Sequence, residues 1–436
     1  MVYNKRMETI VALATPSGNS GVAVIRISGE NSKDILKKLI QQDIEFEPRK
    51  MYLKNVHAGD LVDKCLVVYF KAPFSFTGED VVEVQSHGGY FLCQKIIEQI
   101  ISYGARLSTR GEFSKRAFIN GKMSLDQAEG IIDLINAESE MQAKTGTNLI
   151  QGKLKDKISE YQNEITDVLA DIEAKLDYPE YDYTETETNL IKSRLKNLIE
   201  NLNELILDSK NGLIIKNGVK VAIVGAPNVG KSSLLNSLTK SNKAIVTNIA
   251  GTTRDVVEAE YEFNGIIFRL YDTAGIHESL DKVEQIGISR AYETLDACDI
   301  VLKISSPDSI CQIETKKPFI NVFNKTDLMK TNKNFDICVS AETKENIEEL
   351  KQLIFDKTVK SNIESNKFYL TNTRHIECIN LAINSLETAL EIFSSTTFDI
   401  ISLEIKKAWN YLGEVSGVVS NEEILDRVFS KFCLGK

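Results

Sequence analysis

Cysteine is scarce in this 436-residue sequence, and its seven cysteines are scattered without a short paired spacing. Neither a zinc site nor a disulfide framework is therefore predicted, and a reducing compartment is the simplest setting. No apolar run approaches the roughly 20 residues that cross a bilayer, so no membrane span is expected. The apolar stretch after residues 1–6 ends by Pro16, so no secretory signal is expected either. We expect a cytoplasmic protein.

Positive charge is also limited. The chain has 52 Lys and Arg against 62 Asp and Glu, a net charge of −10, which argues against a broad surface for coating nucleic acid. The charge is uneven, because residues 1–120 hold 16 basic and 13 acidic side chains, a balance of +3, which leaves −13 for the remainder. We therefore expect any contact with RNA to be local, although a balance of +3 is equally typical of ordinary scatter.

The spacing of apolar residues along the chain predicts a mixed α/β region followed by helices. A chain of this length suffices for about three domains. Residues 1–120 contain strand-like runs at 9–14, 22–27, 66–70 and 81–84 and a helix-like run at 91–103. In residues 121–217, apolar side chains recur at helical spacing over 154–176 and again over 195–206. Such a stripe is typical of helix-on-helix packing.

Residues 218–360 have the texture of a different unit. Apolar runs at 219–224, 266–271, 299–304, 319–323 and 337–340 alternate with helical stretches, the pattern of a parallel-sheet α/β domain. Helical periodicity then returns in residues 361–436, over 376–390, 401–412 and 424–432. We expect one helical domain interrupted by the α/β domain, since insertions are tolerated where chain ends lie close; two separate helical domains are the alternative.

A phosphate-binding loop follows the first strand of the inserted domain. It reads Gly225-Ala-Pro-Asn-Val-Gly-Lys-Ser-Ser233, and the strand before it and the helix after it are the context that separates this motif from a chance match. Backbone N–H groups would face phosphates, while Lys231 would reach the β and γ oxygens and Ser232 would ligate Mg²⁺. The expected contacts are Asn228, Val229, Gly230, Lys231, Ser232 and Ser233.

Three further motifs each follow an apolar run. Asp272 is expected to hold the metal through water, and the N–H of Gly275 to sense the γ-phosphate. The carboxylate of Asp327 can accept two hydrogen bonds from guanine, whereas adenine lacks that paired donor edge, so GTP is predicted. The loop that begins at Ser340 would contact the guanine oxygen. The expected contacts are Asp272, Thr273, Ala274, Gly275, Asn324, Lys325, Asp327, Ser340, Ala341 and Glu342.

The segment 247–254 lies between the phosphate loop and Asp272. A mobile segment here should supply a second Mg²⁺ ligand, with Thr253 or Thr252 as the candidate, unless it is a polar loop with nothing bound. The residue after Gly275 is Ile276, which lacks the hydrogen-bonding group of the Gln that orients water in common switch GTPases.

The absence of that Gln leaves two readings. Either hydrolysis is very slow, or another residue positions the water, and the nearby candidates are His277, Glu278 and Glu284. No arginine finger is evident, so a partner or a cation must meet the charge of the transition state.

Together with these motifs, several others resemble the tRNA modification GTPase family MnmE, also called TrmE. The resemblance covers the full length and is carried by Thr77-Gly-Glu-Asp-Val-Val-Glu83, Ser86-His-Gly-Gly89, Arg110-Gly-Glu-Phe-Ser-Lys-Arg-Ala-Phe118, Gly251-Thr-Thr-Arg254, Ile276 and Cys433-Leu-Gly-Lys436. It implies a tetrahydrofolate-binding and dimerisation domain of α/β fold at 1–120. It also implies a Ras-like GTPase domain of TrmE type at 218–360, inserted into a helical domain made of 121–217 and of 361–436 with its tail.

The resemblance also implies an activity. Similar proteins are K⁺-stimulated GTPases that work with an FAD-containing partner, MnmG or GidA, in a heterotetramer or larger assembly. They modify carbon 5 of the wobble uridine of certain tRNAs with a one-carbon unit from a 5-formyl- or 5,10-methylene-tetrahydrofolate. A homodimer, without membrane insertion, is expected.

Residue roles carry over from the family motifs. Asn228, with Thr247, Ile249 and Thr252, would hold K⁺ in place of an arginine finger, where charge develops. Ser232 and Thr253 would hold Mg²⁺, and Glu284 would position water beside the catalytic Lys231. The mobile-segment contacts implied are Thr247, Asn248, Ile249, Ala250, Gly251, Thr252 and Thr253.

The resemblance assigns Arg26, Glu83, Lys122 and Lys436 to folate contact, and Cys433 to tRNA modification. From the residues alone, Arg26 and Lys122 would read as surface cations, Glu83 as a solvent-facing strand residue and Cys433 as a small buried hydrophobe. Two other functions stay open: a ribosome-assembly or RNA-binding GTPase, and a scaffolding switch without folate. GTPases of the ribosome-assembly class usually carry a recognisable basic RNA-binding module, and the N-terminal domain and the C-terminal tail of this chain argue against that reading.

Overall fold

The computed structural model describes residues 8–177, 185–239, 259–272, 295–329, 334–359, 367–419 and 422–435. They divide into two compact units. One unit contains Met1–Ile132, Thr147–Leu195 and Leu381–Lys436, and the other contains Asp133–Gly146 and Lys196–Asn380. No helix within the described ranges is long and apolar enough to cross a membrane.

The first unit contains a six-stranded sheet in the order β3-β4-β5-β2-β1-β6. Its strands are β1 Ile10–Leu13, β2 Ser20–Ser28, β3 Met51–Ala58, β4 Leu61–Phe70, β5 Val81–Gly88 and β6 Arg106–Leu107. All neighbours pair antiparallel except β1 and β6. The four predicted strands and the predicted helix, α2 Tyr90–Ser102, are confirmed, whereas β3 and α1 Ser32–Ile40 were not predicted.

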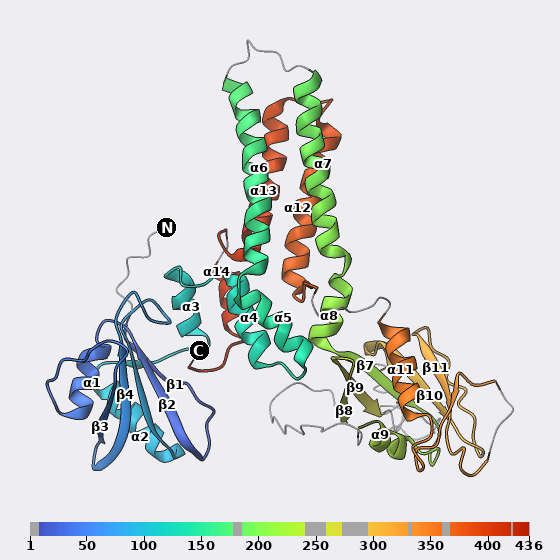
Figure 1. Ribbon diagram of the computed structural model, residues 1–436, viewed down its shortest axis with the longest axis horizontal. Coiled ribbons are helices and arrows are strands. Elements are labelled where there is room, and N and C mark those ends of the chain that lie inside the picture. The colour runs from blue at the N-terminus through green and yellow to red at the C-terminus, as the bar shows by residue number, and fades with distance from the viewer. Residues whose placement is uncertain are drawn as a thin grey trace, which may run out of the picture. The chain divides into compact units, whose positions relative to one another are not determined.

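The two helices α1 and α2 cover one face of this sheet (Figure 1). Alternate residues of β2, such as Ile25 and Ile27, are buried against them, because side chains alternate between the faces of a strand. On the opposite face, Met51, Leu53 and Leu66 remain 51%, 56% and 39% exposed. The sheet therefore has one covered face and one partly apolar open face.

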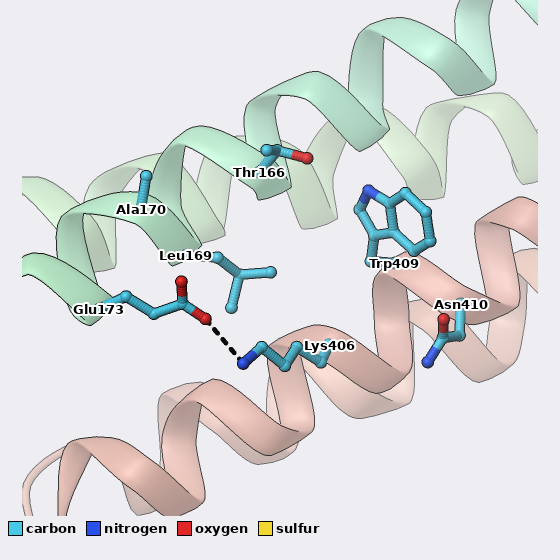
Figure 2. Close-up of a pocket in the computed structure, with 7 residues that line it drawn as sticks. All are labelled: Thr166, Leu169, Ala170, Glu173, Lys406, Trp409 and Asn410. Atoms are coloured by element: carbon cyan, nitrogen blue, oxygen red, sulfur yellow. Dashed lines mark ion pairs between the residues drawn. The ribbon is translucent and has the colours of Figure 1, made fainter. Parts of the chain in front are cut away.

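Helices from both sides of the inserted domain pack together in the first unit. Helix α6 Lys153–Asp177 lies beside α13 Phe398–Ser416. Gln162 donates a 3.0 Å hydrogen bond from Nε2 to the carbonyl oxygen of Trp409, and Figure 2 shows the Glu173–Lys406 ion pair, 2.7 Å long. The expected single, interrupted helical domain is thereby confirmed. A cavity of about 430 Å³ between the two helices is lined by Thr166, Leu169, Ala170, Glu173, Lys406, Trp409 and Asn410.

Four shorter helices also lie outside the inserted domain. They are α3 Glu112–Ile119, α4 Leu125–Ile135, α5 Glu140–Ile150 and α14 Glu422–Phe429. Leu125 and Ala128 of α4 form an apolar cluster with Val428, Phe429 and Phe432. The cluster fixes the chain just before the C-terminal tail. The two remaining helices that flank the inserted domain are α7 Glu185–Leu207 and α12 Thr373–Ile392.

The second unit holds a six-stranded sheet in the order β12-β11-β10-β7-β9-β8. Its elements are β7 Val219–Val224, β8 Ala259–Phe263, β9 Ile266–Asp272, β10 Ile300–Ser305, β11 Phe319–Phe323, β12 Ile337–Cys338, α8 Ser209–Asn217, α9 Lys231–Thr239 and α11 Ile347–Thr358. The predicted parallel pairing is confirmed, and only β8 pairs antiparallel. Because parallel strands place their carboxyl ends at one edge, Asp272 at the end of β9 and the motifs that follow β7, β11 and β12 are expected at the same edge.

Candidate functional site

The phosphate-binding loop runs from the end of β7 to the start of α9 and needs glycine at two positions. A Cβ at Gly225 would lie 2.6 Å from the carbonyl oxygen of Ile304, and a Cβ at Gly230 would lie 2.4 Å from Nδ2 of Asn324. Gly230 also has φ +94°, which favours glycine. Both close approaches hold the loop against the neighbouring strands, with its amides at the N-terminus of α9, where anions bind.

Lys231 is the first residue of α9 and folds back over this loop. Its Nζ donates hydrogen bonds of 3.0 and 3.1 Å to the carbonyl oxygens of Gly225 and Ala226. The ammonium is thereby kept at the loop, within reach of an anion bound there. Phosphate oxygens are stronger acceptors than these carbonyls because hydrogen bonds to charged groups are the stronger ones.

Asn324 connects the phosphate loop with the two guanine motifs. Its buried amide donates from Nδ2 to the carbonyl oxygen of Val229 at 2.9 Å, and its Oδ1 accepts from the N–H of Ala341 at 3.1 Å. Ser237 of α9 adds a 2.6 Å hydrogen bond to the carbonyl oxygen of Ala341. The structure therefore brings three predicted motifs together at one edge of the sheet.

Asp327, the predicted guanine ligand, is held by Ser340. The Ser340 hydroxyl donates to Oδ1 of Asp327 at 2.5 Å and accepts from the N–H of Thr343 at 3.1 Å. Within the described ranges, Oδ2 of Asp327 makes no hydrogen bond. Lys325, two residues before, has φ +65°, which turns this loop sharply. The carboxylate is thus oriented for an external pair of donors.

Asp272 ends β9, directly opposite Ile223 of β7. Its Oδ1 is buried and has no hydrogen-bond partner among the described residues. Burial raises the pKa of this carboxyl above its ordinary value, while the nearby Lys231 ammonium opposes the rise. A buried, uncompensated carboxylate oxygen fits a hard divalent cation. Ser232, the other described candidate for the metal, is exposed at the start of α9.

Several predicted site residues lie outside the described ranges. They are Thr247, Asn248, Ile249, Ala250, Gly251, Thr252, Thr253, Thr273, Ala274, Gly275, Glu284 and Lys436, together with Ile276, His277 and Glu278. The second Mg²⁺ ligand, the water-positioning residue and most of the K⁺ site therefore stay predictions. Asn228 is described: it is exposed, with φ +62°.

A second cluster forms on the open face of the N-terminal sheet. Arg26 of β2 stands opposite Glu83 of β5, with Nε 2.9 Å and Nη2 2.8 Å from Oε1 of the carboxylate, and both side chains are 19% exposed. The Arg26 guanidinium lies 5.4 Å from the ring centre of Phe76 and 5.9 Å from that of Phe113. Neither residue is the freely solvated side chain of the simpler reading.

The C-terminal tail reaches this pair. Nη1 of Arg26 donates to the carbonyl oxygen of Gly435 at 3.4 Å, and the N–H of Gly111 donates to that of Cys433 at 3.5 Å. Cys433 is exposed, so the reading as a buried hydrophobe is wrong. Lys122 is exposed too, and no hydrogen bond or ion pair joins its ammonium to Arg26 or Glu83, all three of which are described.

The motif at 110–118 contributes buried ion pairs next to this cluster. Burial pushes the pKa of Glu112 upward, but hydrogen bonds from Arg106, the Thr109 N–H and Arg116 outweigh burial and hold this pKa at about 2. Arg116 is 2% exposed and also pairs with Glu79 at 3.0 Å. Two buried hydroxyls of this region, Ser108 and Ser114, have no hydrogen-bond partner among the described residues.

Sequence reasoning missed several of these residues. Ser237, Phe76 and the Gly435 carbonyl carry no local pattern that marks them, because each acts through a partner distant in the chain. Phe113 was signalled only as part of the motif at 110–118. Its ring beside Arg26 follows from the pairing of β1 with β6 and the position of α3.

Comparison with known proteins follows the same division. A model of the MnmE helical domain matches residues 125–433, and a model of the GTP-binding protein TrmE N-terminus matches residues 9–122. The tRNA modification GTPase MnmE of Natranaerobius thermophilus is 38% identical, over 98% of this chain and 99% of the relative. That of Sulfurimonas denitrificans is 39% identical over the same shares of both chains.

Among solved structures, the FeoB G-domain of Methanococcus jannaschii is 26% identical and covers 32% of this chain and 97% of its own, with a TM-score of 0.26. The family assignment depends on the sequence matches, which cover nearly the whole of this chain and nearly the whole of each relative. With its phosphate loop, guanine motifs and interrupted helical domain, the chain belongs to the tRNA modification GTPase MnmE family and has the fold of a GTP hydrolase.

Proposed function

We propose that this chain is a K⁺-stimulated GTPase that modifies carbon 5 of the wobble uridine of certain tRNAs, using the one-carbon unit of a tetrahydrofolate. One observation carries the proposal. The chain has a guanine-type nucleotide site around Asp327 and Asn324, and separately an Arg26–Glu83 pair contacted by the C-terminal tail. Relatives of nearly the same length are named tRNA modification GTPases.

The nucleotide site supports GTP and Mg²⁺. Asp327 would accept the guanine N–H donors, and Lys231 would exchange its two loop carbonyls for phosphate oxygens. Ser232 and Asp272, with Thr253, would hold Mg²⁺, which supplies charge stabilisation for the phosphoryl group when bound. The uncompensated Oδ1 of Asp272 is the observation that fits this ion.

Asn228 supports the K⁺ assignment. Its amide makes no hydrogen bond with any other described residue, and the residue is exposed in the left-handed conformation, with φ +62°. Thr247, Ile249 and Thr252 would complete the ligand set. Bound K⁺ supplies positive charge where phosphate charge develops, and Glu284 would orient water in place of the Gln that Ile276 replaces.

The Arg26–Glu83 pair supports the folate. A carboxylate can accept hydrogen bonds from the N–H edge of a pterin, while Arg26, Lys122 and Lys436 supply cations for the glutamate carboxylates of the ligand. The buried hydroxyls of Ser108 and Ser114 have no hydrogen-bond partner among the described residues, so both would be available to a bound ligand. Cys433, exposed on the tail, would serve the tRNA reaction from the same region.

The proposed homodimer is supported by exposed apolar surface. Met51, Leu53 and Leu66 form an apolar patch on the open face of the N-terminal sheet, and such patches mark association sites. A homodimer through residues 1–120 would cover it. An FAD-containing partner of the MnmG type and tRNA would complete the assembly, which we place in the cytoplasm. The helical parts at 121–217 and 361–436 would carry the GTPase domain at 218–360.

Calorimetry with 5-formyl-tetrahydrofolate on the full chain tests the proposal. The native protein should bind, and Glu83→Gln should weaken binding about tenfold, because the hydrogen bonds of a charged acceptor are lost. Glu173→Gln, which alters an ion pair of helices α6 and α13, should bind as the native protein does. No binding by the native chain would instead favour an RNA-binding GTPase or a scaffolding switch.

A further inference from the structure

The turn between α4 and α5 contacts the tip of the β8–β9 hairpin. Ser139 donates a 2.8 Å hydrogen bond from Oγ to the carbonyl oxygen of Gly265, and Glu138 forms an ion pair with Arg269 of β9. Met141 packs against the hairpin, since a Cβ at Gly265 would lie 3.3 Å from its Cβ. Three contacts with the hairpin therefore come from one short segment.

That segment is itself rigidly held. The Ser139 hydroxyl accepts a 3.3 Å hydrogen bond from the N–H of Gln142, and Oε1 of Gln142 accepts from the N–H of Glu138 at 2.6 Å. This reciprocal pattern is close to a capping box at the start of a helix. The turn consequently presents its side chains to the hairpin in one geometry.

The tip of the hairpin is a tight turn whose flanking residues, Phe263 and Ile266, pack against the core of the domain. Asn264 and Gly265 form its two-residue turn, with φ of +50° and +80°, as the tight turns of antiparallel hairpins require. Strand β8 lies at the edge of the sheet and pairs only with β9 within the described ranges. Glu138, Ser139 and Met141 therefore add contacts to the tip that come from outside the sheet.

Strand β9 leads from this tip to Asp272, the proposed metal-holding carboxylate. Arg269, three residues before Asp272, is 20% exposed and pairs with Glu260 of β8 at 2.9 Å as well as with Glu138. It also donates to the carbonyl oxygen of Asn217. One guanidinium thus connects β8, β9, the end of α8 and the α4–α5 turn.

The same segment holds the start of β7, the strand that ends in the phosphate loop. Gln142 donates from Nε2 to the carbonyl oxygen of Lys216 at 3.1 Å, and the Lys216 ammonium lies 2.8 Å from Oδ1 of Asp133. Strand β7 begins three residues later, at Val219. Two of the four strands that lead to the nucleotide site, β7 and β9, are therefore anchored at their far ends on residues 133–142.

We propose that Glu138 and Ser139 are positioning residues for the GTPase reaction. They hold Gly265 and Arg269 at the distal end of β9, and Arg269 in turn bonds to Asn217 ahead of β7, so that they set the position of Asp272 relative to the phosphate loop. By thermodynamic reciprocity, nucleotide and Mg²⁺ bound at the loop must in turn stabilise the α4–α5 turn. The inference depends on GTP hydrolysis with Mg²⁺ alone, and needs neither the K⁺ nor the folate assignment.

Mg²⁺ titrations of GTP turnover on the full chain test this role. The double variant Glu138→Gln with Ser139→Ala should need about tenfold more Mg²⁺ for half-maximal turnover, which corresponds to loss of one charged hydrogen bond. Its kcat at saturating Mg²⁺ should stay near the native value, a split that a general loss of stability would not produce. The matched control Ser102→Ala with Glu173→Gln alters one exposed hydroxyl and one ion pair elsewhere and should leave the titration unchanged.

Hydrogen exchange of residues 133–146 supplies the reciprocal measurement. In the native chain these amides should exchange more slowly after Mg²⁺ and a non-hydrolysable GTP analogue are added, and the double variant should lose most of that protection. A folded double variant with native Mg²⁺ dependence and native protection would overturn the proposal. Loss of K⁺ stimulation or of folate binding, by contrast, would leave it intact.

Discussion

The Ser340 hydroxyl donates a 2.5 Å hydrogen bond to Oδ1 of Asp327, and this contact fixes the carboxylate that we assign to guanine. Ser340 is fully buried, and the N–H of Thr343 holds its oxygen from the other side. The aspartate is therefore oriented before any nucleotide arrives, so that little side-chain entropy is lost on binding.

Asp327→Asn should weaken GTP binding about 100-fold. The amide presents one donor where guanine also presents donors, and a site built to hydrogen-bond a group rejects the mismatched one strongly. Fluorescent-nucleotide titration measures the effect. Asp356→Asn, on the exposed side of α11 in a pair with Gln352, is the control and should bind GTP normally; equal losses in both variants would contradict the assignment.

Asp272→Asn should stabilise the nucleotide-free protein at neutral pH. Burial raises the pKa of Asp272, so its charged form is less stable in the folded chain, and native stability falls as pH rises through the raised pKa. The variant lacks this fall and should melt about 2 °C higher without ligand. With Mg²⁺ and GTP the order should reverse, since only the native carboxylate gains the ion; a variant that gains as much from Mg²⁺ would count against metal binding here.

Glu112→Gln should destabilise the protein mainly at pH values above the ordinary pKa of a glutamate carboxyl. The pKa of Glu112 is held at about 2, so its stabilisation is complete at neutral pH and is lost as pH falls toward that value. We expect about 2 kcal/mol at pH 7 and much less near pH 3, from urea unfolding at both.

Glu45→Gln is the control for this pH dependence. Glu45 also pairs with two cations, Lys33 and Lys37, but its side chain is 78% exposed, and solvent and salt screen such pairs. Its removal should leave unfolding unchanged at moderate salt. A Glu112→Gln penalty of equal size at both pH values would contradict the lowered pKa.

Much of the fold was predictable because its signals are local. Strand β7 was predicted with its exact bounds from an apolar run followed by the phosphate loop, and the sheet around it is parallel as expected. The interrupted helical domain followed from equal helical periods on both sides, and the contact of α6 with α13 confirms it. Strand β8 was missed because Glu260 and Glu262 interrupt its apolar pattern, as they do at a sheet edge.

The parts of the site that escaped prediction depend on contacts between distant segments. Nothing in the sequence places Ser139 against Gly265, 126 residues away, or the Gly435 carbonyl against Arg26, 409 residues away. The motifs identified Asn324 as a nucleotide residue, but its bridge from Val229 to Ala341 required the register of the strands. Motif chemistry is readable locally, whereas the support of each motif comes from tertiary packing.

GTP turnover in KCl and in NaCl of equal ionic strength tests the central claim most directly. The native protein should turn over at least about tenfold faster in KCl, because a cation at Asn228 would supply charge that no described arginine supplies. Asn228→Ala should be slow and equal in both salts, while the exposed control Asn410→Ala should keep the native response. Equal native rates in KCl and NaCl would contradict the account.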